Sequence, residues 1–102
     1  MTTGPIPDET PSNLEEQLLL EEAKRGEGKL IFYGLRKPLR YAPQLVANYG
    51  GSLEDWDKIT TKQSVLIDGA SVQVHWYANS KTGQRVEFKF KREYPKTAPR
   101  NQ

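Results

Sequence analysis

The chain has 102 residues, 27% of them charged, with a formal net charge of +2 at neutral pH, and this length predicts a single domain with one modest core. It has no cysteine, which excludes disulfides, thiolate zinc sites and a cysteine nucleophile, and its single histidine argues against a histidine-rich metal site, so we expect no metal and no cofactor. No stretch is long and apolar enough to span a bilayer and no signal-peptide pattern opens the chain, so we expect no membrane partner.

The modest net charge hides an uneven distribution of charges. Residues 1–28 hold seven acids against two cations, a net −5, whereas residues 29–102 hold thirteen cations against six acids, a net +7. A basic segment of this kind suggests a polyanionic partner, although a solvated surface of mixed sign explains it equally well.

The first third of the chain predicts a leader, a helix and a strand. Residues 1–11 include three prolines and no apolar periodicity, which is typical of a disordered leader or linker. Ser12 and Glu15 have the spacing of a capping box, so a helix is expected from Ser12 to the terminator Gly26. Its core-facing stripe would consist of Leu14, Leu18 and Leu19. The apolar run over 28–34, between glycines, predicts a strand.

The rest of the chain indicates an antiparallel meander. The expected elements are an irregular stretch over 35–43, a short helix over 43–51, a helical turn over 52–58, and strands over 59–67, 71–77 and 85–91. Asp68-Gly69 is a strong two-residue hairpin signal, and the tail over 95–102 is expected to fray. We therefore predict one α+β domain over 12–94, an N-terminal helix packed on an antiparallel sheet of about four strands.

The last hairpin divides into a core face and a polar face, because strand side chains alternate between the two faces of a sheet. The core set would be Val72, Val74, Trp76, Val86, Phe88 and Phe90. The polar set would be Gln73, His75, Tyr77, Arg85, Glu87, Lys89 and Lys91. If residues 79–83 form the loop, His75 lies opposite Glu87, whereas a two-residue shift places it beside Arg85 or Lys89.

The polar face carries the parts for cleaving RNA without a metal ion. His75 could act as general acid or base with Glu87 as its partner, while Lys89 stabilises charge on a phosphoryl group. The ribose 2′-hydroxyl would be the nucleophile. The residues expected to bind nucleic acid are Arg85, Lys91 and Tyr77 on the hairpin and Arg36, Lys37 and Arg40 in the irregular stretch.

The same pattern also has a purely structural interpretation. The solvated face of any antiparallel sheet carries alternating polar residues, and a histidine in such a row is usually ordinary surface. Lys89 and Lys91 could then be edge residues that block aggregation between sheets.

The stretch VHWYANSKTGQRVEFKFK, residues 74–91, resembles the closing motif of C-terminal toxin domains of bacterial polymorphic toxins, of the Rhs-repeat and filamentous-haemagglutinin contact-dependent-inhibition types. The matching positions are His75, Trp76, Asn79, Thr82, Gly83, Glu87, Phe88, Lys89, Phe90 and Lys91. The resemblance implies a barnase- or RelE-like architecture, a helix on an antiparallel sheet whose exposed face is catalytic. It also implies an antibacterial effector blocked by a cognate immunity protein, and many such domains are metal-independent ribonucleases.

The function expected from the sequence is therefore a small antibacterial toxin domain acting as a metal-independent ribonuclease. It would be secreted or delivered as part of a larger effector and act in the cytoplasm of the target cell, or be cytoplasmic if it is an orphan protein. Its expected partners are RNA and an immunity protein, and it would be a monomer when free. The alternatives are a non-catalytic nucleic-acid-binding module and a protein-interaction domain of the immunity or adaptor kind.

Overall fold

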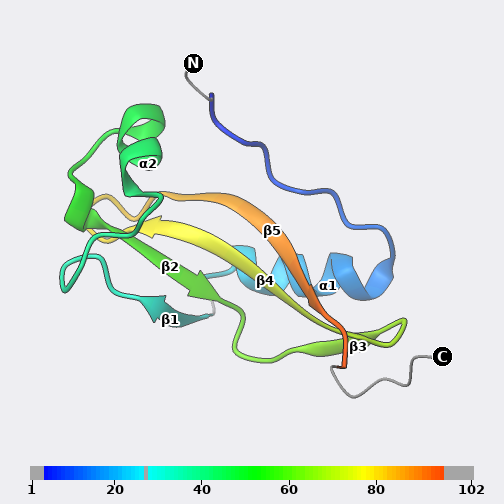
Figure 1. The fold of residues 1–102 in the computed structure, drawn as a ribbon. Helices are drawn as coiled ribbons and strands as arrows, with labels where there is room; N and C mark the ends of the chain where they lie inside the picture. The colour runs from blue at the N-terminus through cyan, green and yellow to red at the C-terminus, as the bar shows by residue number, and fades with distance from the viewer. Residues whose placement is uncertain (1–3, 27, 96–102) are drawn as a thin grey trace, which may run out of the picture.

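The computed structural model describes residues 4–26 and 28–95 as an α+β fold. Its helices are α1 (Leu14–Lys24), α2 (Ala42–Tyr49) and the 3-10 turn η1 (Leu53–Asp55). Its strands are β1 (Lys29–Phe32), β2 (Trp56–Thr60), β3 (Val65–Ile67), β4 (Ala70–Asn79) and β5 (Arg85–Glu93). The predicted N-terminal helix on an antiparallel sheet is confirmed, with five strands instead of about four (Figure 1). Apart from Pro95, the tail expected to fray lies outside the described residues.

β4 is the central strand of the sheet. One edge of β4 pairs with β2 and then with β3, and the other pairs with β5 along most of its length, while β1 extends the sheet beyond β2. The single strand expected over 59–67 is two strands, because the regular ladder with β4 ends at Thr61, whose N–H still donates to the Val74 carbonyl at 2.9 Å. The Thr61 hydroxyl, not its carbonyl, accepts the Val74 N–H at 3.1 Å. Asp68 and Gly69 form the predicted turn between β3 and β4, with φ of 51° and 82°.

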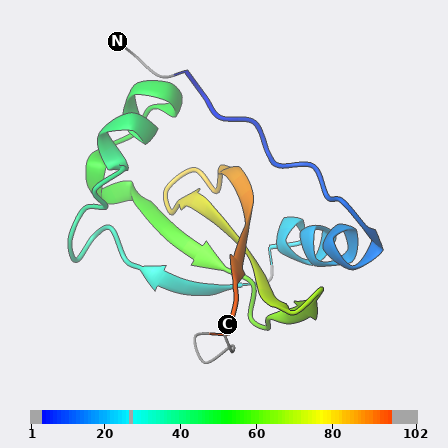
Figure 2. The ribbon, with the colours of Figure 1, turned by 45° about the vertical axis from the view of Figure 1, so that its right-hand side comes forward.

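Helices cover both faces of the sheet, as Figure 2 shows, with α1 on one side and α2 on the other. The core beneath α1 consists of Leu19, Ala23, Ile67, Ala70, Val72, Val74, Trp76, Phe88 and Phe90. Of the leucines expected in the stripe of α1, only Leu19 is buried, whereas Leu14 and Leu18 are 65% and 56% exposed. The buried side of the helix instead runs through Glu16, Leu19 and Ala23, which are spaced by three and four residues.

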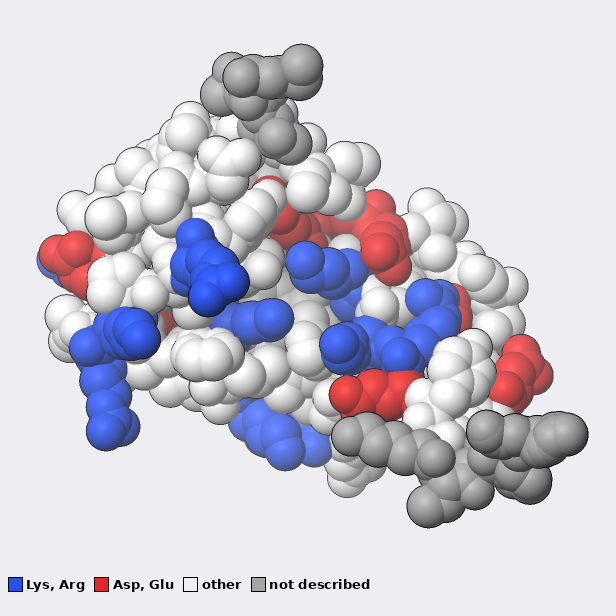
Figure 3. Space-filling view, viewed as in Figure 1, with Lys and Arg blue, Asp and Glu red and all other residues white. Residues whose placement is uncertain are grey.

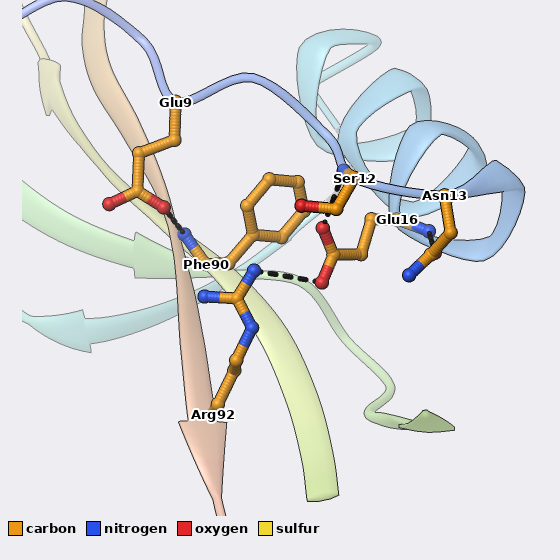
Figure 4. A network of polar contacts seen from close by, with 6 residues as sticks. All are labelled: Glu9, Ser12, Asn13, Glu16, Phe90 and Arg92. Atoms are coloured by element: carbon orange, nitrogen blue, oxygen red, sulfur yellow. Dashed lines mark hydrogen bonds and ion pairs between the residues drawn. The ribbon is translucent and has the colours of Figure 1, made fainter. Parts of the chain in front are cut away.

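Glu16 is a buried acid that ties the start of α1 to β5 (Figure 4). Asn13, and not Ser12, is the N-cap, and its Oδ1 accepts the Glu16 N–H at 2.8 Å. The Glu16 carboxylate accepts the Ser12 N–H at 2.9 Å and Nη2 of Arg92 at 2.8 Å. Burial alone would raise the pKa of Glu16, but these bonds to Ser12 and Arg92 outweigh it and lower that pKa.

The segment before α1 runs along the outer edge of β5 (Figure 1). This segment was expected to be a disordered leader, and its residues 4–11 contain neither helix nor strand. Two of its acids nevertheless attach it to β5. The Glu9 N–H donates to the Phe88 carbonyl at 2.9 Å. The Phe88 and Phe90 N–H groups donate to the carboxylates of Asp8 and Glu9 at 3.1 and 3.0 Å. These bonds cover an edge that would otherwise be free to pair with another strand.

A second core lies on the opposite face of the sheet, under α2 and the loop that precedes it. It consists of Leu39, Ala42, Leu45, Trp56, Tyr77 and Val86. Gly34 holds the loop close to β2, because its N–H donates to Asp57 Oδ1 at 2.8 Å and a Cβ at this position would collide with the Trp56 carbonyl oxygen. The face expected to be polar throughout is therefore covered at the α2 end of the sheet.

Candidate functional site

The part of this face that α2 leaves uncovered is centred on His75 of β4. We call it the open face, and it comprises Lys58, Gln73, His75, Lys89 and Lys91. His75 lies opposite Thr60 of β2 and Lys89 of β5, and the half-buried imidazole has its Nε2 3.4 Å from Gln73 Oε1. Figure 3 shows Lys and Arg gathered over β2, β4 and β5 on this side, with acids both beside them and at the margins.

Three lysines and partial burial keep the His75 imidazole neutral at physiological pH. Burial is the largest cause, and the charges of Lys58, Lys91 and Lys89 add to it, so that the pKa of His75 falls from 6.5 to about 4 despite the opposing charge of Glu93. The pKa of Lys58 is also lowered, by burial and then by Lys89 and Lys91. Because these cations repel one another, a bound anion would be strongly attracted to the site and would relieve that repulsion.

Thr60 adds an unused hydroxyl beside His75. Its side chain is buried, and its Oγ1 has no hydrogen-bond partner among residues 4–26 and 28–95. Thr60 and His75 are direct cross-strand neighbours, so their side chains lie next to each other on the same face of the sheet.

The structure has the register in which His75 faces Lys89, not the one in which it faces Glu87. The loop is residues 80–83 instead of the expected 79–83, because the Asn79 N–H donates to the Gln84 carbonyl and Arg85 then faces Ala78. Glu87 restores the alternation because it adopts a positive φ of 59° and forms a bulge. Phe88 and Lys89 therefore keep their predicted faces, and so does Glu87, although α2 covers it, whereas Arg85 and Val86 exchange faces.

Glu87 is an anchor for α2 in this structure and is not exposed beside His75. It is 3% exposed, and its two carboxylate oxygens accept the hydroxyl of Tyr41 at 3.0 Å and that of Tyr49 at 2.9 Å. Burial, followed by the hydrogen bond to Glu87 and its charge, raises the pKa of Tyr41 to about 12 and raises that of Tyr49 as well.

Two further residues of the predicted polar set lie elsewhere. Tyr77 is only 6% exposed, and its ring packs on that of Tyr41 with 5.2 Å between the ring centroids. The Lys89 Nζ lies 5.3 Å from the centroid of the Tyr77 ring. The loop register turns Arg85 toward the α1 face, where its Nη1 lies 3.4 Å from the Ala23 carbonyl oxygen. Arg85 is thus separated from His75 by the sheet.

The cations of the irregular stretch lie beside the open face. Arg36, Lys37 and Arg40 are exposed in the loop between β1 and α2. Lys37 and Arg40 line a cavity together with Lys58 and Tyr77, but Arg36 does not.

Sequence reasoning missed Lys58, whose charge acts on His75 more strongly than that of any other residue. Residues 52–58 were expected to form a helical turn, and a helix would not have placed Lys58 beside β4. The available signal was the alternation of Trp56, Lys58 and Thr60, which a strand directs to one face.

Comparisons with protein-family models, with curated proteins and with solved structures find no match for this chain. Within residues 4–26 and 28–95, no group of three or more His, Asp or Glu side chains is placed to hold a metal ion. No helix in the same part of the chain is long and apolar enough to cross a membrane.

Proposed function

We propose that this protein is a ribonuclease that cleaves RNA without a metal ion and serves as an antibacterial toxin domain. One observation carries the proposal: a half-buried, neutral imidazole stands among three lysines on an open sheet face. A general base must be unprotonated at working pH, and a phosphodiester needs cations around it. His75 and its neighbours provide both conditions.

In the proposed reaction His75 takes the proton of the ribose 2′-hydroxyl, whose oxygen attacks the adjacent phosphorus. A bond forms between the 2′-oxygen and phosphorus as the bond from phosphorus to the 5′-oxygen breaks. Lys89 and Lys91 stabilise the negative charge that develops on the phosphoryl oxygens. Lys58, whose lowered pKa makes it a better acid, donates the proton to the leaving 5′-oxygen. The products are a 2′,3′-cyclic phosphate and a free 5′-hydroxyl.

The toxin assignment draws on the resemblance of residues 74–91 to the closing motif of polymorphic-toxin domains. Under this proposal the domain is delivered into a target cell and acts on RNA in its cytoplasm. A cognate immunity protein would block it by presenting acids to the open face, since three lysines there have no carboxylate directly opposite them.

The test is controlled expression in a bacterium, together with RNA cleavage by the purified protein in EDTA. The parent should arrest growth and degrade RNA, and His75→Ala should do neither while unfolding at the same urea concentration. Lys89→Ala should be impaired, whereas Lys81→Ala, an equal loss of charge at the exposed turn, should behave like the parent. Undiminished RNA degradation by His75→Ala would refute the assignment.

A non-catalytic nucleic-acid-binding module is the second candidate, and the position of Glu87 favours it. The expected acidic partner of His75 is occupied by Tyr41 and Tyr49. Such a module would bind RNA through the same lysines, lose affinity steeply as salt rises, and release it uncut.

A further inference from the structure

A cavity of about 520 Å³ adjoins the open face. It lies between the end of β1, the loop over 33–41 and the neighbouring strand β2, the region where Figure 2 shows that loop joining β1 to α2. Its lining consists of Phe32, Lys37, Pro38, Leu39, Arg40, Tyr41, Lys58 and Tyr77. The volume is in the range of pockets that enclose small organic molecules.

The cavity and the His75 site are parts of one continuous surface. Lys58 and Tyr77, which face each other across β2 and β4, both line the cavity. Lys58 is also the strongest charged neighbour of His75, and Tyr77 lies under Lys89 Nζ. A ligand with an anion at His75 therefore has its next group at the mouth of the cavity.

The lining combines flat apolar surfaces with cations. Phe32 is 58% exposed on an edge strand, although a ring of this size normally gains by being covered. Tyr41 and Tyr77 contribute a tilted ring pair, and the Tyr41 hydroxyl already donates to Glu87. Lys37, Arg40 and Lys58 are the charged members of the lining, and no acid is among the described residues that line it.

We infer that this cavity holds the nucleobase and ribose next to the phosphate at His75, with the base stacked on Phe32. Aromatic rings that stack on bases and cations that follow the phosphates are the combination that binds single-stranded nucleic acid. Such a base must be unpaired and turned away from its neighbours to enter the cavity. The ligand class is therefore a nucleotide of single-stranded RNA. The inference rests on the proposed function only in taking the anion at His75 to be a phosphodiester.

Binding of small probes tests the inference without requiring turnover. The probes are adenosine 3′-monophosphate, ribose 5-phosphate and inorganic phosphate, each titrated calorimetrically and by the NMR shift of the single histidine. The parent should bind the nucleotide at least about fivefold more tightly than ribose 5-phosphate, the lower end of what one stacked base contributes. Phe32→Ala should lose that difference and keep its affinity for ribose 5-phosphate.

Leu30→Ala is the matched control. Leu30 is on the same strand and is 51% exposed, but it does not line the cavity. This variant should bind all three probes like the parent. Equal affinities of the parent for nucleotide and ribose 5-phosphate, or an unchanged nucleotide affinity in Phe32→Ala, would overturn the inference. An acidic peptide that displaces the nucleotide and binds more tightly than it would also overturn it, in favour of a protein partner.

The two proposals can fail separately. If the parent prefers the nucleotide through Phe32 but never cuts RNA, the base site stands and the ribonuclease proposal falls. If the parent cuts RNA in EDTA but shows no preference for the nucleotide, the ribonuclease proposal stands and the base site falls.

Discussion

The hydrogen bond from the Tyr49 hydroxyl to Glu87 should contribute a large part of the free energy of unfolding of this small domain. Replacing Tyr49 with Phe removes one of the two tyrosine hydrogen bonds to the Glu87 carboxylate and keeps the ring, which packs 5.8 Å from Trp56 between centroids. A hydrogen bond to a charged group contributes about 1.5–3 kcal/mol net. Because the Glu87 side chain is buried, water cannot easily replace the lost donor, and we expect a loss of this size.

The assay is urea unfolding followed by tryptophan fluorescence, since Trp56 and Trp76 are both buried in the cores. Tyr49→Phe should lower the midpoint with an unchanged slope, which identifies a change in stability and not in the unfolded state. Tyr33→Phe, at a tyrosine that is 46% exposed, is the control and should unfold like the parent. A loss below about 0.5 kcal/mol in Tyr49→Phe would refute the anchoring role, because it is smaller than an ordinary net hydrogen bond.

Glu87→Gln separates anchoring from catalysis. Removing a general acid or base costs about 10²- to 10⁴-fold in rate. If Glu87 only holds α2, the variant should be less stable but cleave RNA at the parental rate per folded molecule. A loss of that size in folded protein would instead make Glu87 catalytic.

Three further results are expected. The NMR titration of His75 should give a pKa of about 4, and Lys58→Met should raise it toward 6.5 because the strongest neighbouring cation is gone; an unchanged value would contradict the cationic cluster. Since the folded pKa of His75 is depressed, the unfolded chain binds more protons, so the unfolding free energy should fall as pH drops from about 6.5 to 5, a slope that His75→Gln should reduce. Arg92→Met should raise the pKa of Glu16 and cost about 1–3 kcal/mol of stability, as expected for a buried acceptor that loses a donor; full stability in this variant would show that the ion pair is dispensable.

The sequence predicted the sheet faces wherever regular alternation continues. Val72, Val74 and Trp76 meet Phe88 and Phe90 in one core as expected, because a strand with one buried face has little freedom of register. Only Arg85 and Val86 lie on the opposite faces from those predicted. A positive φ at Glu87 has no sequence signal of the kind that a glycine would provide, so the bulge could not be foreseen.

The second core, under α2, could also not be predicted from the sequence. The pattern over 43–51 predicted a helix, but nothing in it indicated which sheet face the helix would cover, and Tyr77 could pass for a polar-face residue until α2 was placed over it. The position of α2 decides which part of the face remains open. Because α2 covers Glu87 and leaves His75 and Lys89 open, its position also separates the buried Glu87 from the site.

The most direct measurement uses a DNA oligonucleotide that carries a single ribonucleotide, incubated with the protein in EDTA. Attack by a 2′-hydroxyl predicts one cut, on the 3′ side of that ribonucleotide, with a 2′,3′-cyclic phosphate and a 5′-hydroxyl identified by mass. The all-deoxy oligonucleotide should remain intact, as should the chimera treated with His75→Ala. An uncut chimera, or cuts at deoxynucleotides as well, would contradict a neutral His75 activating the ribose.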